Sequence, residues 1–62
     1  MSRAHFEVYR DESDAWRWRL VHRNGNILAD SGQGYTTKAA ARKGVRSVKN
    51  NAAGAPVRET AD

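Results

Sequence analysis

The chain has no cysteine, so neither a disulfide bond nor a thiolate metal site can stabilise its 62 residues. It also has no apolar run close to the roughly 20 residues that a membrane-spanning helix needs. The N-terminus does not resemble a signal peptide, because Arg3 and His5 are followed at once by alternating residues. These absences predict a cytoplasmic protein without a membrane segment.

Large apolar side chains are scarce, because alanine supplies much of the 39% hydrophobic content. Full burial of one large apolar side chain stabilises a fold by roughly 1.5–3 kcal/mol, whereas ordering each residue costs roughly 1.5 kcal/mol. The indoles of Trp16 and Trp18 have few apolar companions within one chain, so we expect a second copy to help cover them. The sequence therefore predicts a homodimer.

Acidic residues are missing from one part of the chain, although the net charge is only +4. No carboxylate lies between Asp30 and Glu59. Six cations fall in this gap: Lys38, Arg42, Lys43, Arg46, Lys49 and Arg58. The charge is thus unevenly distributed, which is compatible with an acidic partner such as a nucleic acid.

Alternation of apolar and polar residues predicts three strands, over residues 5–10, 15–23 and 26–31. Asn24-Gly25, between the second and third, is the strongest short-range hairpin signal, and a type I′ turn requires positive φ at both positions. Both connections are short enough for hairpins, so the expected sheet is an antiparallel meander.

The pattern becomes helical from residue 38 to about residue 50. An apolar stripe runs through Ala41, Val45, Val48 and Ala52. Ala40 and Gly44 lie beside it and are small enough to let the helix approach a sheet that carries two indoles. Thr36 or Thr37 is the expected N-cap.

The expected fold is therefore α+β, with three antiparallel strands followed by one helix (β-β-β-α), paired as a homodimer. A single domain is expected over residues 5–57. Residues 1–4 are expected to form a flexible N-terminus, and residues 58–62 a mobile tail.

In this order and spacing, the motifs resemble the YegP-like family of small domains, whose function is unassigned. The resemblance covers residues 5–57. It is carried by Phe6-Glu7-Val8-Tyr9, Trp16-Arg17-Trp18-Arg19-Leu20, Asn24-Gly25-Asn26, Ala29-Asp30-Ser31-Gly32-Gln33-Gly34-Tyr35, Thr37-Lys38-Ala39-Ala40, Val45-Arg46-Ser47-Val48-Lys49 and Ala55-Pro56-Val57. It implies a β-β-β-α unit that occurs in tandem in some relatives and as a homodimer in single-unit members. It implies no catalytic residues.

Two sets of residues are candidates for interaction. The core and dimer anchors are Trp16, Trp18, Leu20, Val21 and Leu28. The nucleic-acid contacts are Arg17, Arg19 and Arg23 on the second strand and Lys38, Arg42, Arg46 and Lys49 along the helix. Each basic set has an alternative interpretation: Glu7 can pair with an arginine across the hairpin, and exposed helical cations can serve solubility alone.

No pattern predicts catalysis, a cofactor or a metal. Gly32-x-Gly34 precedes a helix but lacks the spacing of a phosphate-binding loop, so a turn that needs positive φ is expected there. His5 and His22 lie on different strands without metal-ligand spacing. The serines lack an adjacent base. The sequence thus predicts a non-catalytic homodimeric interaction module, possible contact with another protein, and, as the alternative, weak nucleic-acid binding.

Overall fold

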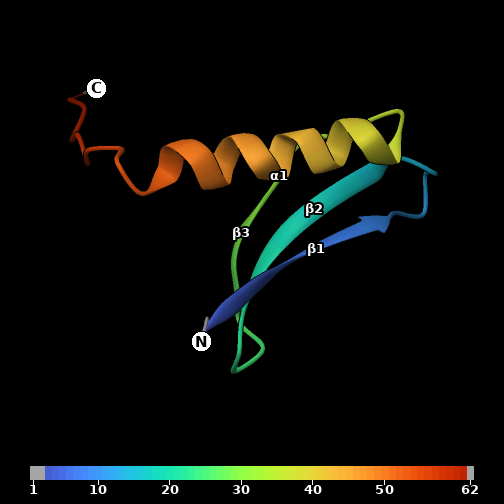
Figure 1. Ribbon diagram of the computed structural model, residues 1–62, viewed down its shortest axis with the longest axis horizontal. Coiled ribbons are helices and arrows are strands. Elements are labelled where there is room, and N and C mark those ends of the chain that lie inside the picture. The colour runs from blue at the N-terminus through green and yellow to red at the C-terminus, as the bar shows by residue number, and fades with distance from the viewer. Residues whose placement is uncertain (1–2, 62) are drawn as a thin grey trace.

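A computed structural model describes residues 3–61 as three strands followed by one helix. The elements are β1 (Ala4–Arg10), β2 (Trp16–His22), β3 (Ile27–Asp30) and α1 (Lys38–Ala52). The strands form one antiparallel sheet in the order β1-β2-β3, and α1 lies across one face of it (Figure 1). The expected β-β-β-α order is confirmed.

The expected boundaries agree with the observed ones to within two residues. Residue 4, which we expected in the flexible N-terminus, already belongs to β1. Residues 1 and 2 of that segment, and residue 62 of the expected tail, lie outside the described residues.

The register of β1 and β2 builds the core. Phe6 faces Leu20 and Val8 faces Trp18 across the hairpin, and α1 contacts these two strands. The Phe6 and Trp18 rings meet edge to face, with their centroids 5.8 Å apart. Such aromatic pairs add about 0.5–1.5 kcal/mol beyond the area that they bury. Phe6 and Trp18 therefore form the centre of the apolar layer.

Small residues let α1 lie close to the indole of Trp18, as the sequence predicts. Ala41 is fully buried against the sheet. A Cβ built on Gly44 would lie 3.0 Å from Trp18 Nε1 and 2.7 Å from Tyr35 Oη. Any side chain at position 44 would force one of these rings or the helix to move.

One chain is enough to bury one of the two indoles. Trp18 is only 7% exposed, because β1 and α1 enclose it. The expectation that Trp18 needs a second copy for its burial is therefore wrong: the small helix residues let α1 approach closely enough to cover the ring. Trp16 remains half-buried at the end of the same strand face.

The turn between β2 and β3 differs from the expected type I′ turn. Gly25 has φ of 93°, but Asn24 does not have positive φ. Gly25 N–H donates to His22 O, and His22 N–H donates to Asn26 O, each at 2.8 Å. This is a three-residue loop, in which a type I turn is followed by one left-handed residue. Asn24 instead accepts a hydrogen bond from Asn26 N–H through its side chain.

The third strand is short and fully exposed, because α1 contacts β1 and β2 but not β3 among the described elements. Leu20 pairs with Ala29 and Val21 pairs with Ile27, so Leu28 is an extra residue in a β-bulge. Ile27 is 58% exposed and Leu28 55% exposed. The bulge explains why the alternation in this segment is irregular.

The connection into α1 is fixed by side chains that bond to the backbone. Thr37 is the N-cap, and its Oγ1 accepts a hydrogen bond from Ala40 N–H at 3.1 Å. Gly32 has φ of 70°, and its N–H donates to Asp30 Oδ1 at 2.9 Å. The segment 32–34 is thus a turn, as expected. Beyond α1 the chain runs on as an extended tail that leaves the sheet (Figure 1).

Candidate functional site

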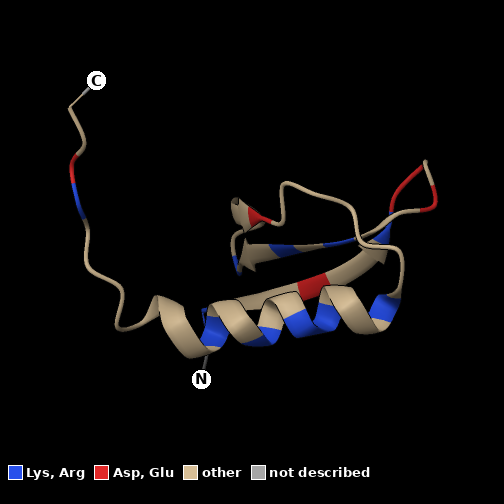
Figure 2. Cartoon of the chain, turned by 90° about the horizontal axis from the view of Figure 1, so that it is seen from above, with Lys and Arg blue, Asp and Glu red and all other residues tan. Residues whose placement is uncertain are grey.

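The exposed side of α1 carries the most concentrated charge in the described part of the chain. Its five cations are all exposed: Lys38, Arg42, Lys43, Arg46 and Lys49. Within residues 3–61, none of them forms an ion pair, and α1 contains no acidic residue (Figure 2). The five cations from the segment that lacks acidic residues thus form one positively charged surface on α1, which we call the basic helix face.

The two arginines of β2, Arg17 and Arg19, lie on the opposite, helix-free face of the sheet, and carboxylates of the same chain neutralise both. Arg19 Nε donates to Glu7 Oε1 at 2.7 Å and lies over the Tyr9 ring. Arg17 Nε donates to Asp11 Oδ2. This is the cross-strand pairing that the sequence left open as the alternative to nucleic-acid contact.

These pairs also shift the protonation equilibria on the helix-free face. Hydrogen bonds from His5 and from Arg19 hold the pKa of Glu7 below its ordinary value of 4.5. The hydrogen bond from Arg17 and the backbone N–H of Ala15 hold the pKa of Asp11 below 3.8. Both carboxylates are therefore ionised at neutral pH and neutralise the β2 arginines.

The seven expected nucleic-acid contacts are consequently divided among three places. Lys38, Arg42, Arg46 and Lys49 share the basic helix face. Arg17 and Arg19 are paired on the helix-free face. Arg23 is exposed in the β2–β3 loop, where its backbone N–H donates to Arg3 O. The structure thus brings together only the helical group.

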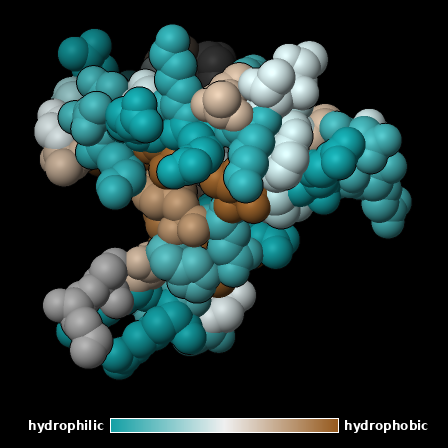
Figure 3. Space-filling view, turned by 45° about the vertical axis from the view of Figure 1, so that its right-hand side comes forward, coloured by the Kyte–Doolittle hydropathy of each residue, from teal (hydrophilic) through white to brown (hydrophobic). Residues whose placement is uncertain are grey.

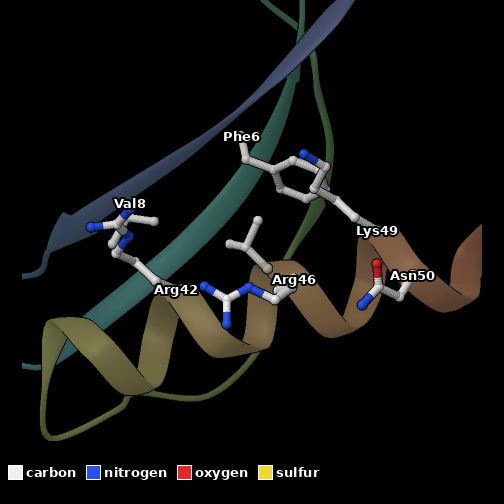
Figure 4. Close-up of a pocket in the computed structure, with 7 residues that line it drawn as sticks. Phe6, Val8, Arg42, Arg46, Lys49 and Asn50 are labelled. Carbon is white, nitrogen blue, oxygen red and sulfur yellow. The ribbon is translucent and has the colours of Figure 1, made fainter.

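A groove of about 350 Å³ runs between β1 and α1. Phe6, Val8 and Val45 supply its apolar lining, and Arg42, Arg46, Lys49 and Asn50 project from α1 around it (Figure 4). On the face drawn in Figure 3, apolar surface is visible as a strip between hydrophilic side chains. The sequence did not indicate this groove, because it forms between residues of β1 and of α1 that lie far apart in the chain.

The expected dimer anchors are scattered rather than gathered. Trp18 is in the core, while Trp16 and Leu20 are half-buried on the same face. Val21 is half-buried on the helix-free face, and Leu28 is exposed in the bulge. These five side chains do not form one continuous patch on a single face.

Trp16 has an environment that the sequence did not indicate. The guanidinium of Arg10 lies 5.6 Å from the centroid of its ring system and the amine of Lys38 5.7 Å. Its backbone is fixed by two hydrogen bonds to Tyr35, at 2.8 and 2.7 Å. An aromatic ring is therefore held at the end of α1 where the row of cations begins.

No group of three or more metal-ligand side chains comes together within residues 3–61. His5 is hydrogen-bonded to Glu7, and Ser31 Oγ donates to the carbonyl of Gln33.

The single helix of the described chain is too short and too polar to cross a bilayer.

These features define a small α+β domain whose distinguishing surfaces are charged and apolar patches. The chain belongs to the family described as "Domain of unknown function (DUF1508)", whose model matches residues 11–59. The resemblance to the YegP-like family is confirmed at this level.

Relatives and a solved structure support this assignment. A UPF0339 protein of Methanosarcina acetivorans is 50% identical over 52 residues, which cover 84% of this chain and 88% of the relative. A UPF0339 protein of Neisseria meningitidis serogroup B is 40% identical over 55 residues, covering 89% and 96%. The NMR solution structure of a protein from Haloferax volcanii, 60% identical, superposes with a TM-score of 0.89 over 97% of this chain and 100% of that chain. None of these names assigns an enzymatic activity.

Proposed function

We propose that this protein is a cytoplasmic, non-catalytic interaction module that works as a homodimer. The observation that carries the proposal is the amount of apolar surface that one copy leaves open. Ile27 and Leu28 are more than half exposed, Val57 is 95% exposed, and the groove between β1 and α1 is uncovered. Of these, the groove is the feature typical of an interaction site, because its apolar lining is rimmed by polar side chains.

The groove and the tail are complementary. The groove offers apolar side chains beneath a rim of Arg42, Arg46 and Lys49. The tail carries the exposed apolar Val57 two residues before the carboxylate of Glu59. Val57 of one copy can fill the groove of the other, while Glu59 approaches the cationic rim.

The sheet edge beside the groove favours the same arrangement. β1 is an outer strand of the described sheet, so its outer edge over residues 5–10 can accept a further strand. The tail between residues 55 and 61 has no regular structure of its own and is fully exposed. An extended segment from a second copy could therefore lie along β1 by strand addition.

The length of one relative is compatible with a paired unit. A UPF0339 protein of Stutzerimonas stutzeri is 43% identical over 47 residues, which make up only 41% of its length. That chain is thus long enough to hold two such units, and a short chain would obtain the same pairing through association.

Sedimentation equilibrium across a wide protein concentration range tests this proposal. The wild type should sediment as a dimer, and Val57→Asp should shift it to the monomer because a carboxylate would enter an apolar groove. Thr60→Asp, which adds the same charge to the same tail, is the matched control and should remain dimeric. A wild type that stays monomeric at every concentration, with its circular dichroism intact, would overturn the proposal.

A second candidate function, weak nucleic-acid binding, is favoured by the basic helix face. Five exposed cations without ion-pair partners in the described chain offer a surface for phosphates. Counterion release gives nearly one unit of log K per phosphate contact for each tenfold change in salt concentration.

A mobility-shift assay at low salt tests this second function. Arg42→Glu with Arg46→Glu should abolish the shift and flatten the salt dependence. Arg23→Glu with Arg58→Glu, which changes the net charge equally but away from α1, should retain most of the binding. Equal loss in both double variants would show that only net charge matters and would refute a helical site.

A further inference from the structure

The half-buried Trp16 lies at the start of the basic helix face. It shares a strand face with Trp18, but α1 covers Trp18 and leaves part of Trp16 accessible. The hydrogen bonds to Tyr35 fix its backbone in place. A rigidly held aromatic ring beside a cationic surface is the usual combination in proteins that bind unpaired nucleotides.

The cations of α1 extend away from the Trp16 ring along one side of the helix. Lys38 lies 5.7 Å from the ring centroid. Arg42 and Arg46 follow at intervals of four residues, so each lies about 6 Å further along the helix axis. An open hollow of about 650 Å³ on this side of α1 is lined by Lys38, Ala39, Arg42, Lys43 and Arg46. The row can therefore contact several phosphates in succession.

The other side of Trp16 is neutralised. Arg10 lies 5.6 Å from the ring but also approaches Asp14, at 3.4 Å, in the β1–β2 turn. Phosphates are thus favoured towards Lys38 and disfavoured towards the turn, where Glu12 is also exposed. A bound strand would have its stacked base at Trp16 and its backbone running along α1.

We propose that Trp16 stacks on a base of a single-stranded nucleic acid whose phosphates contact Lys38, Arg42 and Arg46. This inference rests on the nucleic-acid function proposed above and specifies the kind of strand. Bases of a duplex have their faces covered by their neighbours, so only an unpaired or extruded base can stack on a side chain. Lys38 is long and exposed, so its amine can leave the ring for a phosphate when a base arrives.

The test titrates the protein with oligothymidine, and separately with the same strand annealed to oligoadenine, at low salt. Binding is measured by mobility shift and by quenching of tryptophan fluorescence. The single strand should bind more tightly and quench the emission. Trp16→Leu should weaken binding of the single strand about 5- to 150-fold, the range expected for loss of one stacked base. Trp16→Tyr, which keeps a stacking ring, should restore most of it.

The outcomes distinguish failure of nucleic-acid binding by the basic helix face from failure of base stacking by Trp16. If both nucleic acids bind equally and Trp16→Leu binds like the wild type, a basic helical site remains but stacking by Trp16 is refuted. If neither nucleic acid binds, both the nucleic-acid function and the stacking by Trp16 are refuted. Circular dichroism checks that Trp16→Leu is folded. If Trp16→Leu is unfolded, the more conservative Trp16→Phe replaces it. Loss of fluorescence quenching in Trp16→Phe would show that the indole of Trp16 contacts the base.

Discussion

Replacing Gly44 by alanine changes two contributions to stability in opposite directions. Alanine has the higher helix propensity, but its side chain disturbs the packing of α1 against the sheet. At an exposed helical position this change stabilises a protein by about 1 kcal/mol, because glycine loses more backbone entropy on folding. At position 44 the new Cβ would lie 2.7 Å from Tyr35 Oη and 3.0 Å from Trp18 Nε1. Trp18 is buried and cannot swing aside, so the helix or the Tyr35 ring must shift.

The two effects have opposite signs, and their magnitudes decide between them. Overpacking of this kind costs about 1–3 kcal/mol. Subtracting the gain in helix propensity leaves Gly44→Ala less stable than the wild type by about 1 kcal/mol. For a domain of this size, such a loss lowers Tm by about 4–8 °C.

Thermal and urea unfolding, followed by circular dichroism, measure this difference. All variants are compared at one protein concentration, because association raises apparent stability by mass action. Ser47→Ala, at an exposed position of the same helix, is the control and should be slightly more stable than the wild type. If Gly44→Ala were also more stable, the close contact between α1 and Trp18 would be refuted.

Three further predictions concern the turns and the helix-free face. Thr37→Ala should lower the free energy of unfolding by about 1 kcal/mol in urea titrations, because it removes the acceptor for a first-turn N–H. Asp14 has φ of 65°, so Asp14→Ala should be less stable than Asp14→Gly by about 1 kcal/mol in the same assay, both variants lacking the carboxylate. Hydrogen bonds from His5 and Arg19 lower the pKa of Glu7 in the folded state. Ionised Glu7 therefore stabilises the fold above pH 4.5, and this contribution disappears as the pH falls through the lowered pKa. Between pH 6 and about pH 3, the free energy of unfolding should therefore fall less steeply for Glu7→Gln than for the wild type. Equal falls in the two proteins would contradict the role of the hydrogen bonds to Glu7.

The local elements could be predicted because their signals are local. Alternating residues, a glycine at the hairpin turn and a regular apolar stripe each depend on neighbours within one strand or one turn of helix. Thr37 could cap α1 because it stands directly before the first helical residue. The pairing of Glu7 with Arg19 follows from the same register that aligns the first two strands.

The sequence by itself determined the order of elements, the small-residue stripe of α1 and the absence of acids that makes this helix basic. Only the tertiary structure decided which side chains share a surface. It paired Arg17 with Asp11, enclosed Trp18 without a second copy, and brought Lys38 within reach of Trp16. The reason is physical: periodicity fixes the face of each element separately, whereas the groove, the partly open indole and the distribution of charge depend on how closely the helix lies on the sheet.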